Sequence, residues 1–276
     1  MIFSKFSLLP ILLLMIGCSD DIPNRYSGTQ ILSGECTMCD ARYQNLSDLN
    51  LSNSIYKGTY FYNSNLSNTD LSNSDLRSAN FVLANLSQSN LSQTNIRNAV
   101  FTDASMFGSS LKGANGSMAN FQNANMDSSE LSEATLTTAN FSGSILDNVF
   151  ATNSYMMSAS FNGANMKNIL VENSNLEGAD LSNANLKNSR LKMVNFKNTN
   201  FEGADLSNSI IEYSDFSGAN LKGVNFNGAI LVGLNLTQAD LSNSDLLNST
   251  MSSLVSEATL YCNARMQNGE RNTSCD

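Results

Sequence analysis

The chain has 276 residues, of which 14% are charged, and a formal net charge of −9 with neither histidine nor tryptophan. Its acidic balance disfavours binding to nucleic acids. The lack of histidine removes the commonest general base and every histidine-dependent catalytic triad, so we expect no enzyme activity, no cofactor and no metal.

Residues 1–17 are expected to form a signal peptide. Lys5 supplies a positive charge, and an apolar run extends from Phe6 to Ile16. The length of this run fits the roughly 7–15 residues of a secretory signal and falls short of the ~20 that a membrane-spanning helix needs. Removal of Lys5 lowers the 15 basic residues to 14 against 24 acidic ones, which gives a net charge of −10.

The signal ends in a sequence that resembles the lipobox of bacterial lipoproteins, Leu14-Met15-Ile16-Gly17-Cys18. The resemblance implies that Cys18 carries lipid, including palmitate, and becomes the mature N-terminus, so the protein is anchored in the cell envelope outside the cytoplasm. Ser19 stands where Asp would indicate inner-membrane retention, which favours the outer membrane. The alternative is an ordinary secretory signal followed by a coincidental cysteine. Residues 18–35 then form a tether, and residues 36–45 an N-terminal cap.

Residues 46–253 are one continuous repeat. From Leu46 to Met251 every fifth residue is large and apolar in 42 consecutive units, with only Gly116 and Ala151 departing. The residue two positions earlier is Ala, Ser or Thr in 35 of them. A period of five matches neither a helix nor a flat strand, and repetition of this length indicates a solenoid. The only prolines, Pro10 and Pro23, lie outside the repeat, which fits a continuously hydrogen-bonded backbone.

The units resemble those of the pentapeptide-repeat family, A(D/N)LXX, as in Asp180-Leu181 and Asn185-Leu186. The resemblance covers about three-quarters of the chain. It implies an all-β fold, a right-handed quadrilateral parallel β-helix in which each unit forms one side and four units form one coil. The array then makes about 10 coils and a rod of roughly 50 Å at the usual strand spacing.

The large residues themselves favour four sides. Between Phe61 and Phe201 phenylalanine recurs at every fourth centre along one side, interrupted only by Leu181, whereas a triangular coil of three units would scatter it. We expect these rings to stack inside the rod as a core ladder: Phe61, Phe81, Phe101, Phe121, Phe141, Phe161 and Phe201.

The four cysteines after Cys18 allow three disulfide pairings. The rod would hold the first two about 50 Å from the last two, whereas a disulfide needs Cα atoms within ~7 Å. We therefore expect Cys36–Cys39 in the N-terminal cap and Cys262–Cys275 in a C-terminal cap, residues 254–276, that begins where the repeat register breaks near Leu260. The Cys-x-x-Cys spacing also suits a redox motif or half a zinc site, although no second ligand pair lies within reach.

One outward column departs from the repeat. The residue before each unit's centre is Asn or Asp in 26 of the 42 units. On one side five consecutive coils instead carry Phe150, Leu170, Arg190, Ile210 and Ile230. With Tyr213 nearby and a charged rim of Glu172, Lys192 and Glu212, this column has the character of a protein contact surface. The alternative is that these side chains partly tuck under neighbouring turns.

Three functions are compatible with these features. The first is a non-enzymatic, lipid-anchored envelope protein that acts as a rigid scaffold and contacts an envelope protein or a second copy of itself, but no nucleic acid. The family resemblance implies an alternative, an acidic mimic of DNA that binds gyrase, although an export signal argues against a cytoplasmic target. A flat face that binds ice or polysaccharide is disfavoured because Ser and Asn, rather than Thr, dominate the outer columns.

Overall fold

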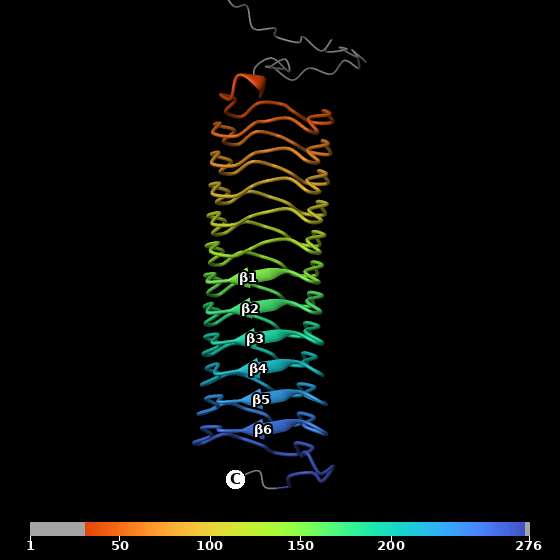
Figure 1. Cartoon of the computed structure of the whole chain (residues 1–276), viewed down its shortest axis with the longest axis vertical. Helices are drawn as coiled ribbons and strands as arrows, with labels where there is room; N and C mark the ends of the chain where they lie inside the picture. Colours follow the sequence, from red (N-terminus) through yellow and green to blue (C-terminus); the bar gives the residue numbers. More distant parts are fainter. Residues whose placement is uncertain (1–30, 274–276) are drawn as a thin grey trace, which may run out of the picture.

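The computed structural model describes residues 31–273, and the chain in this range winds into a long rod of stacked coils (Figure 1). Parallel backbone bridges join residues that lie 20 positions apart, from Glu35↔Ile55 at one end to Asp245↔Arg265 at the other. One coil is therefore made of four five-residue units. The expected four-sided, all-parallel β-solenoid is confirmed.

Strands of three residues form on one side of the rod only, where they stack in chain order as a single parallel sheet. Their bounds are β1 (Phe150–Thr152), β2 (Leu170–Glu172), β3 (Arg190–Lys192), β4 (Ile210–Glu212), β5 (Ile230–Val232) and β6 (Thr250–Ser252). Each strand pairs in register with the strand of the next coil, so that Phe150 lies opposite Leu170 and Arg190 opposite Ile210. On the other three sides, and on this side before β1, each unit contributes a single bridging residue.

The bridges extend beyond the interval 46–253 at both ends. They begin at Glu35, and the spacing of five continues through Val255, Leu260 and Arg265. The expected register break near Leu260 is therefore wrong. The backbone keeps its pairing even where exposed Ser256 takes the place of an apolar centre, because the bridges need no side chain. From Glu35 to Arg265 the ladder spans eleven and a half coils, slightly more than expected, and an antiparallel bridge between Arg265 and Arg271 then ends the rod.

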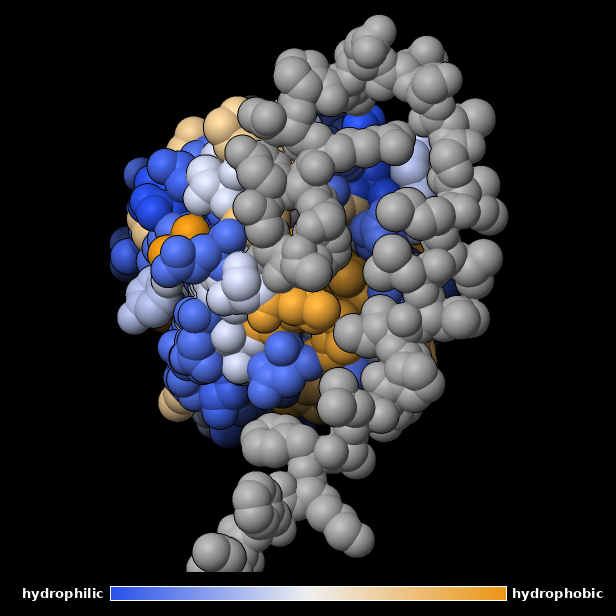
Figure 2. Space-filling view, turned by 90° about the horizontal axis from the view of Figure 1, so that it is seen from above, coloured by the Kyte–Doolittle hydropathy of each residue, from blue (hydrophilic) through white to orange (hydrophobic). Residues whose placement is uncertain are grey.

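The apolar centres of the units fill the inside of the rod. Phe61, Phe81, Phe101, Phe121, Phe141 and Phe161 stack with centroids 4.7–4.9 Å apart and ring planes within 7° of parallel. Beyond Leu181 the stack gives way to an edge contact between Phe196 and Phe201, with centroids 5.1 Å apart. Viewed along the axis from the N-terminal end, hydrophobic residues gather towards the middle and hydrophilic ones around the rim (Figure 2).

Asparagine at the position before the apolar centre of a unit stabilises both the turn that follows and the stacking of neighbouring coils. The Oδ1 atom of Asn65 accepts the Ser67 N–H at 3.2 Å and the Nδ2 of Asn85, one coil on, at 3.1 Å. Its Nδ2 donates to Asn45, one coil back, at 2.9 Å. A single side chain thus satisfies a turn amide and joins three coils, which accounts for the Asn and Asp columns of the sequence.

Each corner is a tight turn that requires a left-handed residue. In the unit centred on Tyr56, the Thr59 N–H donates to the Tyr56 carbonyl at 3.1 Å, and Gly58 between them has φ of 65°. Asn takes this place in many other units, as at Asn53 with φ of 56°. Gly and Asn adopt such φ values at the lowest cost, as a type II turn demands at its third residue.

Candidate functional site

The strands bring the predicted apolar column together on one side of the rod. Phe150, Leu170, Ile210 and Ile230 lie one above another across β1–β5, with Arg190 between the second and third. Phe150 and Ile230 are 49% and 42% exposed, whereas Leu170 and Ile210 are half-buried. The column is therefore accessible to a partner, most of all at its two ends.

Arg190 is held between the acids of the neighbouring column. Its Nε lies 3.5 Å from Oε1 of Glu172 in β2, and its Nη2 lies 3.2 Å from Oε2 of Glu212 in β4. Exposed pairs of this kind contribute only about 0.2–1 kcal/mol each, so their effect is to position charge rather than to stabilise the rod. Lys192 makes no ion pair of its own within residues 31–273, but it lies between Glu172 and Glu212 in the sheet, so the two acids and the two bases of the rim balance.

Tyr213 extends the apolar surface at the corner that follows β4. It is 58% exposed, and its ring covers Gly233 of the next coil, where an added Cβ would lie 2.6 Å from the tyrosine Cδ1. Met193, one coil earlier in the same column, is also exposed. Sequence reasoning missed Met193, although its place at a turn position that usually holds Asn or Gly was a usable signal. We call the whole area the stripe surface: Phe150, Leu170, Met193, Ile210, Tyr213 and Ile230.

Lysines and aspartates elsewhere on the rod pair by a fixed rule, in which a Lys after one centre reaches an Asp in the next coil. Lys187–Asp205, Lys197–Asp215 and Lys222–Asp240 have N–O distances of 3.1, 3.4 and 3.2 Å. Burial raises the pKa of each aspartate. Hydrogen bonds from the serine two residues on, together with the lysine, outweigh burial and leave each pKa below its usual value. These three lysines are therefore neutralised within the rod itself.

A cavity of about 10 Å³ in the described part of the rod is lined by apolar side chains such as Phe216, Leu221 and Met251. Glu130 accepts the Ser132 N–H and Glu133 pairs with Lys112 at 3.4 Å, so each acid has a partner of its own. Residues 31–273 contain no group of three His, Cys, Asp or Glu side chains placed to hold a metal. Within the same range no helix is both long and apolar enough to cross a bilayer.

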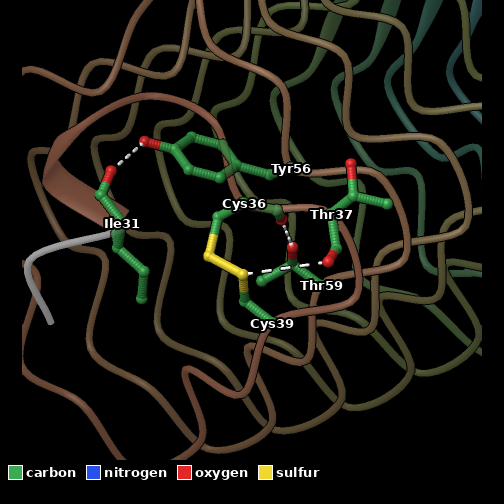
Figure 3. The surroundings of a disulfide bond; sticks show 6 residues. All are labelled: Ile31, Cys36, Thr37, Cys39, Tyr56 and Thr59. Carbon is green, nitrogen blue, oxygen red and sulfur yellow. Dashed lines mark hydrogen bonds between the residues drawn. A yellow bond between two sulfur atoms is a disulfide. The ribbon is translucent and has the colours of Figure 1, made fainter. Parts of the chain in front are cut away.

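The N-terminal coil contains a disulfide between Cys36 and Cys39, whose Cα atoms are 5.4 Å apart (Figure 3). Beside it the Tyr56 hydroxyl donates to the Ile31 carbonyl at 2.7 Å, and the Thr59 hydroxyl donates to the Cys36 carbonyl. Cys262 is also disulfide-bonded. Its expected partner Cys275, like the lipidation candidate Cys18, lies outside the described residues.

Comparisons with known proteins agree with this architecture. A family model described as a pentapeptide repeat region matches residues 150–236. A second, described as pentapeptide repeats (8 copies), matches residues 45–82, 84–115 and 104–143. A search of curated proteins found no match.

Similar solved structures include three with related repeats. HetL, a pentapeptide repeat protein involved in heterocyst differentiation regulation in the cyanobacterium Nostoc sp. strain PCC 7120, is 20% identical over 88% of this chain and 97% of its own, with a TM-score of 0.36. A trypsin-treated form of QnrB1, a plasmid-mediated fluoroquinolone resistance protein, is 18% identical over 78% and 92%, with a TM-score of 0.41. A thylakoid-lumen protein of Arabidopsis thaliana is 29% identical over 43% and 68%, with a TM-score of 0.20.

The residues matched by the two family models together cover well over half of the chain. The chain belongs to the pentapeptide repeat family.

Proposed function

We propose that this protein is a lipid-anchored, non-enzymatic protein of the bacterial envelope, and that its rigid rod presents the stripe surface to a protein partner or to a second copy of itself. The observation that carries the proposal is the column on β1–β5. There, apolar side chains replace the Asn and Asp that elsewhere hydrogen-bond the turns and join the coils. Giving up those hydrogen bonds for partly exposed apolar groups is costly unless the groups are covered.

The size of the stripe limits what it can do alone. Fully burying a large apolar side chain gains roughly 1.5–3 kcal/mol, and two of the four column residues are already half-buried. Association costs an estimated ~4–15 kcal/mol in lost freedom, so the column by itself supports at most weak binding. Contacts to Tyr213, Met193 and the charged rim are needed for a stable complex.

The anchor and the compartment rest on the sequence. The lipobox-like segment that ends at Cys18 supports lipidation. The Cys36–Cys39 disulfide supports an oxidising compartment, because such bonds persist outside the cytoplasm.

The test of the stripe is a variant with serine at Phe150, Leu170, Ile210 and Ile230. A matched control carries serine at four exposed apolar residues away from the column: Leu83, Phe107, Met118 and Ile145. Association would be measured by crosslinking in membranes and by analytical ultracentrifugation of the purified protein. We expect the stripe variant to lose association while the control keeps it. Equal association in both would contradict the proposed contact surface.

The acidic charge and rod shape also support the gyrase-binding alternative. A gyrase supercoiling assay with the mature rod distinguishes the gyrase-binding protein from the envelope scaffold. Strong protection of gyrase at stoichiometric concentration would favour the alternative, and no protection is expected for an envelope scaffold.

A further inference from the structure

The N-terminal end of the rod carries a second group of exposed apolar residues, separate from the stripe surface. Met38, Tyr43, Ile55 and Tyr60 are all exposed, and Tyr62 beside them is half-buried. We call these five residues the N-terminal patch. We propose that this patch rests in the interfacial layer of the lipid bilayer and fixes the orientation of the rod; the inference builds on the proposed lipid anchor at Cys18.

The patch is drawn from two neighbouring coils and extends around one corner of the rod, with Ile55 on one side and Tyr60 and Tyr62 on the next. The Tyr43 and Tyr62 rings meet edge to face with centroids 5.6 Å apart. Met38 lies over Gly58 of the next coil, with its Cγ 3.3 Å from where a Cβ would stand. Tyr60 is bridged to Asp40 one coil back and lies two positions before Tyr62. Met38 and Tyr43, each 67% exposed, are the most exposed large apolar residues of the described chain.

The position of the patch identifies the bilayer as its occupant. The described chain enters the rod at Ile31, and only the short segment 19–30 separates Ile31 from Cys18. Even fully extended, a segment of this length spans only about 45 Å, so a lipid on Cys18 keeps this end of the rod within reach of the membrane. The patch belongs to the first two coils, a height of about 10 Å at the usual strand spacing. That height matches the roughly 5–10 Å by which amphipathic surfaces enter the headgroup layer.

The chemistry of the patch suits that layer. Tyrosine is enriched at membrane–water interfaces, where its ring meets the acyl boundary and its hydroxyl stays hydrated. The charges beside the patch balance in number: Arg42 Nη2 and Asp40 Oδ2 pair at 2.7 Å, and Glu35 and Lys57 add one charge of each sign. Contact therefore depends on apolar burial and tolerates salt and zwitterionic lipid, in keeping with the acidic net charge of the chain.

The proposed contact leaves the stripe surface available. Phe150, where the column starts, lies four and a half coils after Tyr60. At the usual strand spacing this places the stripe roughly 20 Å further along the rod. The membrane contact and the protein contact can thus be made at the same time and tested independently.

Because the natural sequence has no tryptophan, a single Trp is a clean reporter. Tyr43→Trp and Tyr60→Trp would report from the patch, and Tyr155→Trp and Phe107→Trp, at exposed aromatic residues further along the rod and outside the stripe surface, would serve as matched controls. The full-length lipidated variants would be reconstituted into phosphatidylethanolamine–phosphatidylcholine vesicles, with and without brominated phosphatidylcholine. We expect a blue shift and quenching by the brominated lipid for the patch reporters only.

The outcomes separate this inference from the lipid anchor. If the protein floats with vesicles but the patch reporters behave like the controls, the patch proposal is overturned and the anchor stands. If the protein does not float, the anchor fails. The same reporters in residues 19–276, held by an N-terminal hexahistidine tag on nickel-chelating lipid, then decide the patch alone: quenching supports it, and unquenched emission overturns it.

Discussion

At the scale of single residues, the repeat combines one large and one small side chain inside each side of the square. Phe101 and Ala99 are both fully buried, and the same pairing recurs at Phe121 and Ala119. The small residue leaves room at the corner for the large one, so the inward side chains of all coils pack into one continuous core along the rod. The buried set could be predicted from the sequence because this pattern repeats without a slip.

The phenylalanine stack should contribute strongly to stability. Phe101 lies between Phe81 and Phe121 with both centroid distances at 4.8 Å, and it has no solvent exposure. Phe101→Ala should lower the free energy of unfolding by about 3–5 kcal/mol, because it removes a buried ring and leaves a cavity. Chemical denaturation followed by circular dichroism would measure the change.

Phe107 gives a control of the same residue type in the neighbouring unit, since its ring is exposed. Phe107→Ala should change stability by less than about 0.5 kcal/mol. Equal effects of the two substitutions would contradict the buried stack.

At the scale of elements, the column on β1–β5 could be predicted as an apolar departure, but its uneven exposure could not. Leu170 and Ile210 both lie next to Arg190, whose long side chain reaches along the column to Glu172 and Glu212. Phe150 and Ile230 end the column and stay more open. Exposure within a column depends on what lies one coil away, which a linear reading of one unit does not weigh.

Strand formation itself was also beyond the sequence pattern. Ile145 and Tyr155 are likewise apolar or aromatic residues before a centre, yet each makes single bridges rather than joining a strand. Loss of Asn at this position is therefore not sufficient for a strand. The extension of the ladder to Arg265 could not be predicted for a related reason. Exposed Ser256 interrupts the series of apolar centres in the sequence, while the backbone bridges continue past it.

The lysine–aspartate pairs between coils predict how stability depends on pH. The pKa values of Asp205, Asp215 and Asp240 lie below their ordinary value in the folded rod. Their contribution is therefore fully present above the unfolded pKa of about 3.9 and is lost as pH falls through the lower folded pKa. The denaturation midpoint should decrease as pH is lowered from about 5 towards 2.

A variant with Asn at all three positions isolates this effect. Asn keeps the hydrogen bond to the serine amide two positions on, but it carries no charge and does not titrate. Its midpoint should vary less with pH than that of the natural protein. The same pH dependence in both proteins would show that these carboxylates are not responsible.

At the scale of the whole molecule, the rod is a chain of coils in which each coil contacts its neighbours above and below. Its parallel ladder runs from Glu35 to Arg265, and the Cys36–Cys39 disulfide and the Arg265–Arg271 bridge lie at its two ends. The period of five and the recurrence of phenylalanine at every fourth unit were enough to predict this architecture. The repeat does not predict the identity of a partner, because a partner would contact the residues that depart from the repeat.

Coil length makes a prediction about deletions. Removal of residues 111–130 takes out one whole coil and joins Ser110 to Leu131 in the original register. The rod should remain folded, with the stripe surface unchanged and a similar unfolding midpoint. Removal of residues 111–120 is half a coil, which places the Phe101 side against a different side of the following coils. The half-coil deletion should lower the midpoint, and equal midpoints for both deletions would contradict the four-unit register.

The central claim, that this rod is anchored by lipid and works outside the cytoplasm, is tested most directly by metabolic labelling with palmitate in a Gram-negative host. The natural chain and Cys18→Ala would be compared for label and for membrane fractionation. The account predicts that the natural chain is labelled and sediments with membranes, and that Cys18→Ala loses both properties. An unlabelled natural chain that stays soluble in the cytoplasm would contradict the account and move the gyrase-binding alternative to the front.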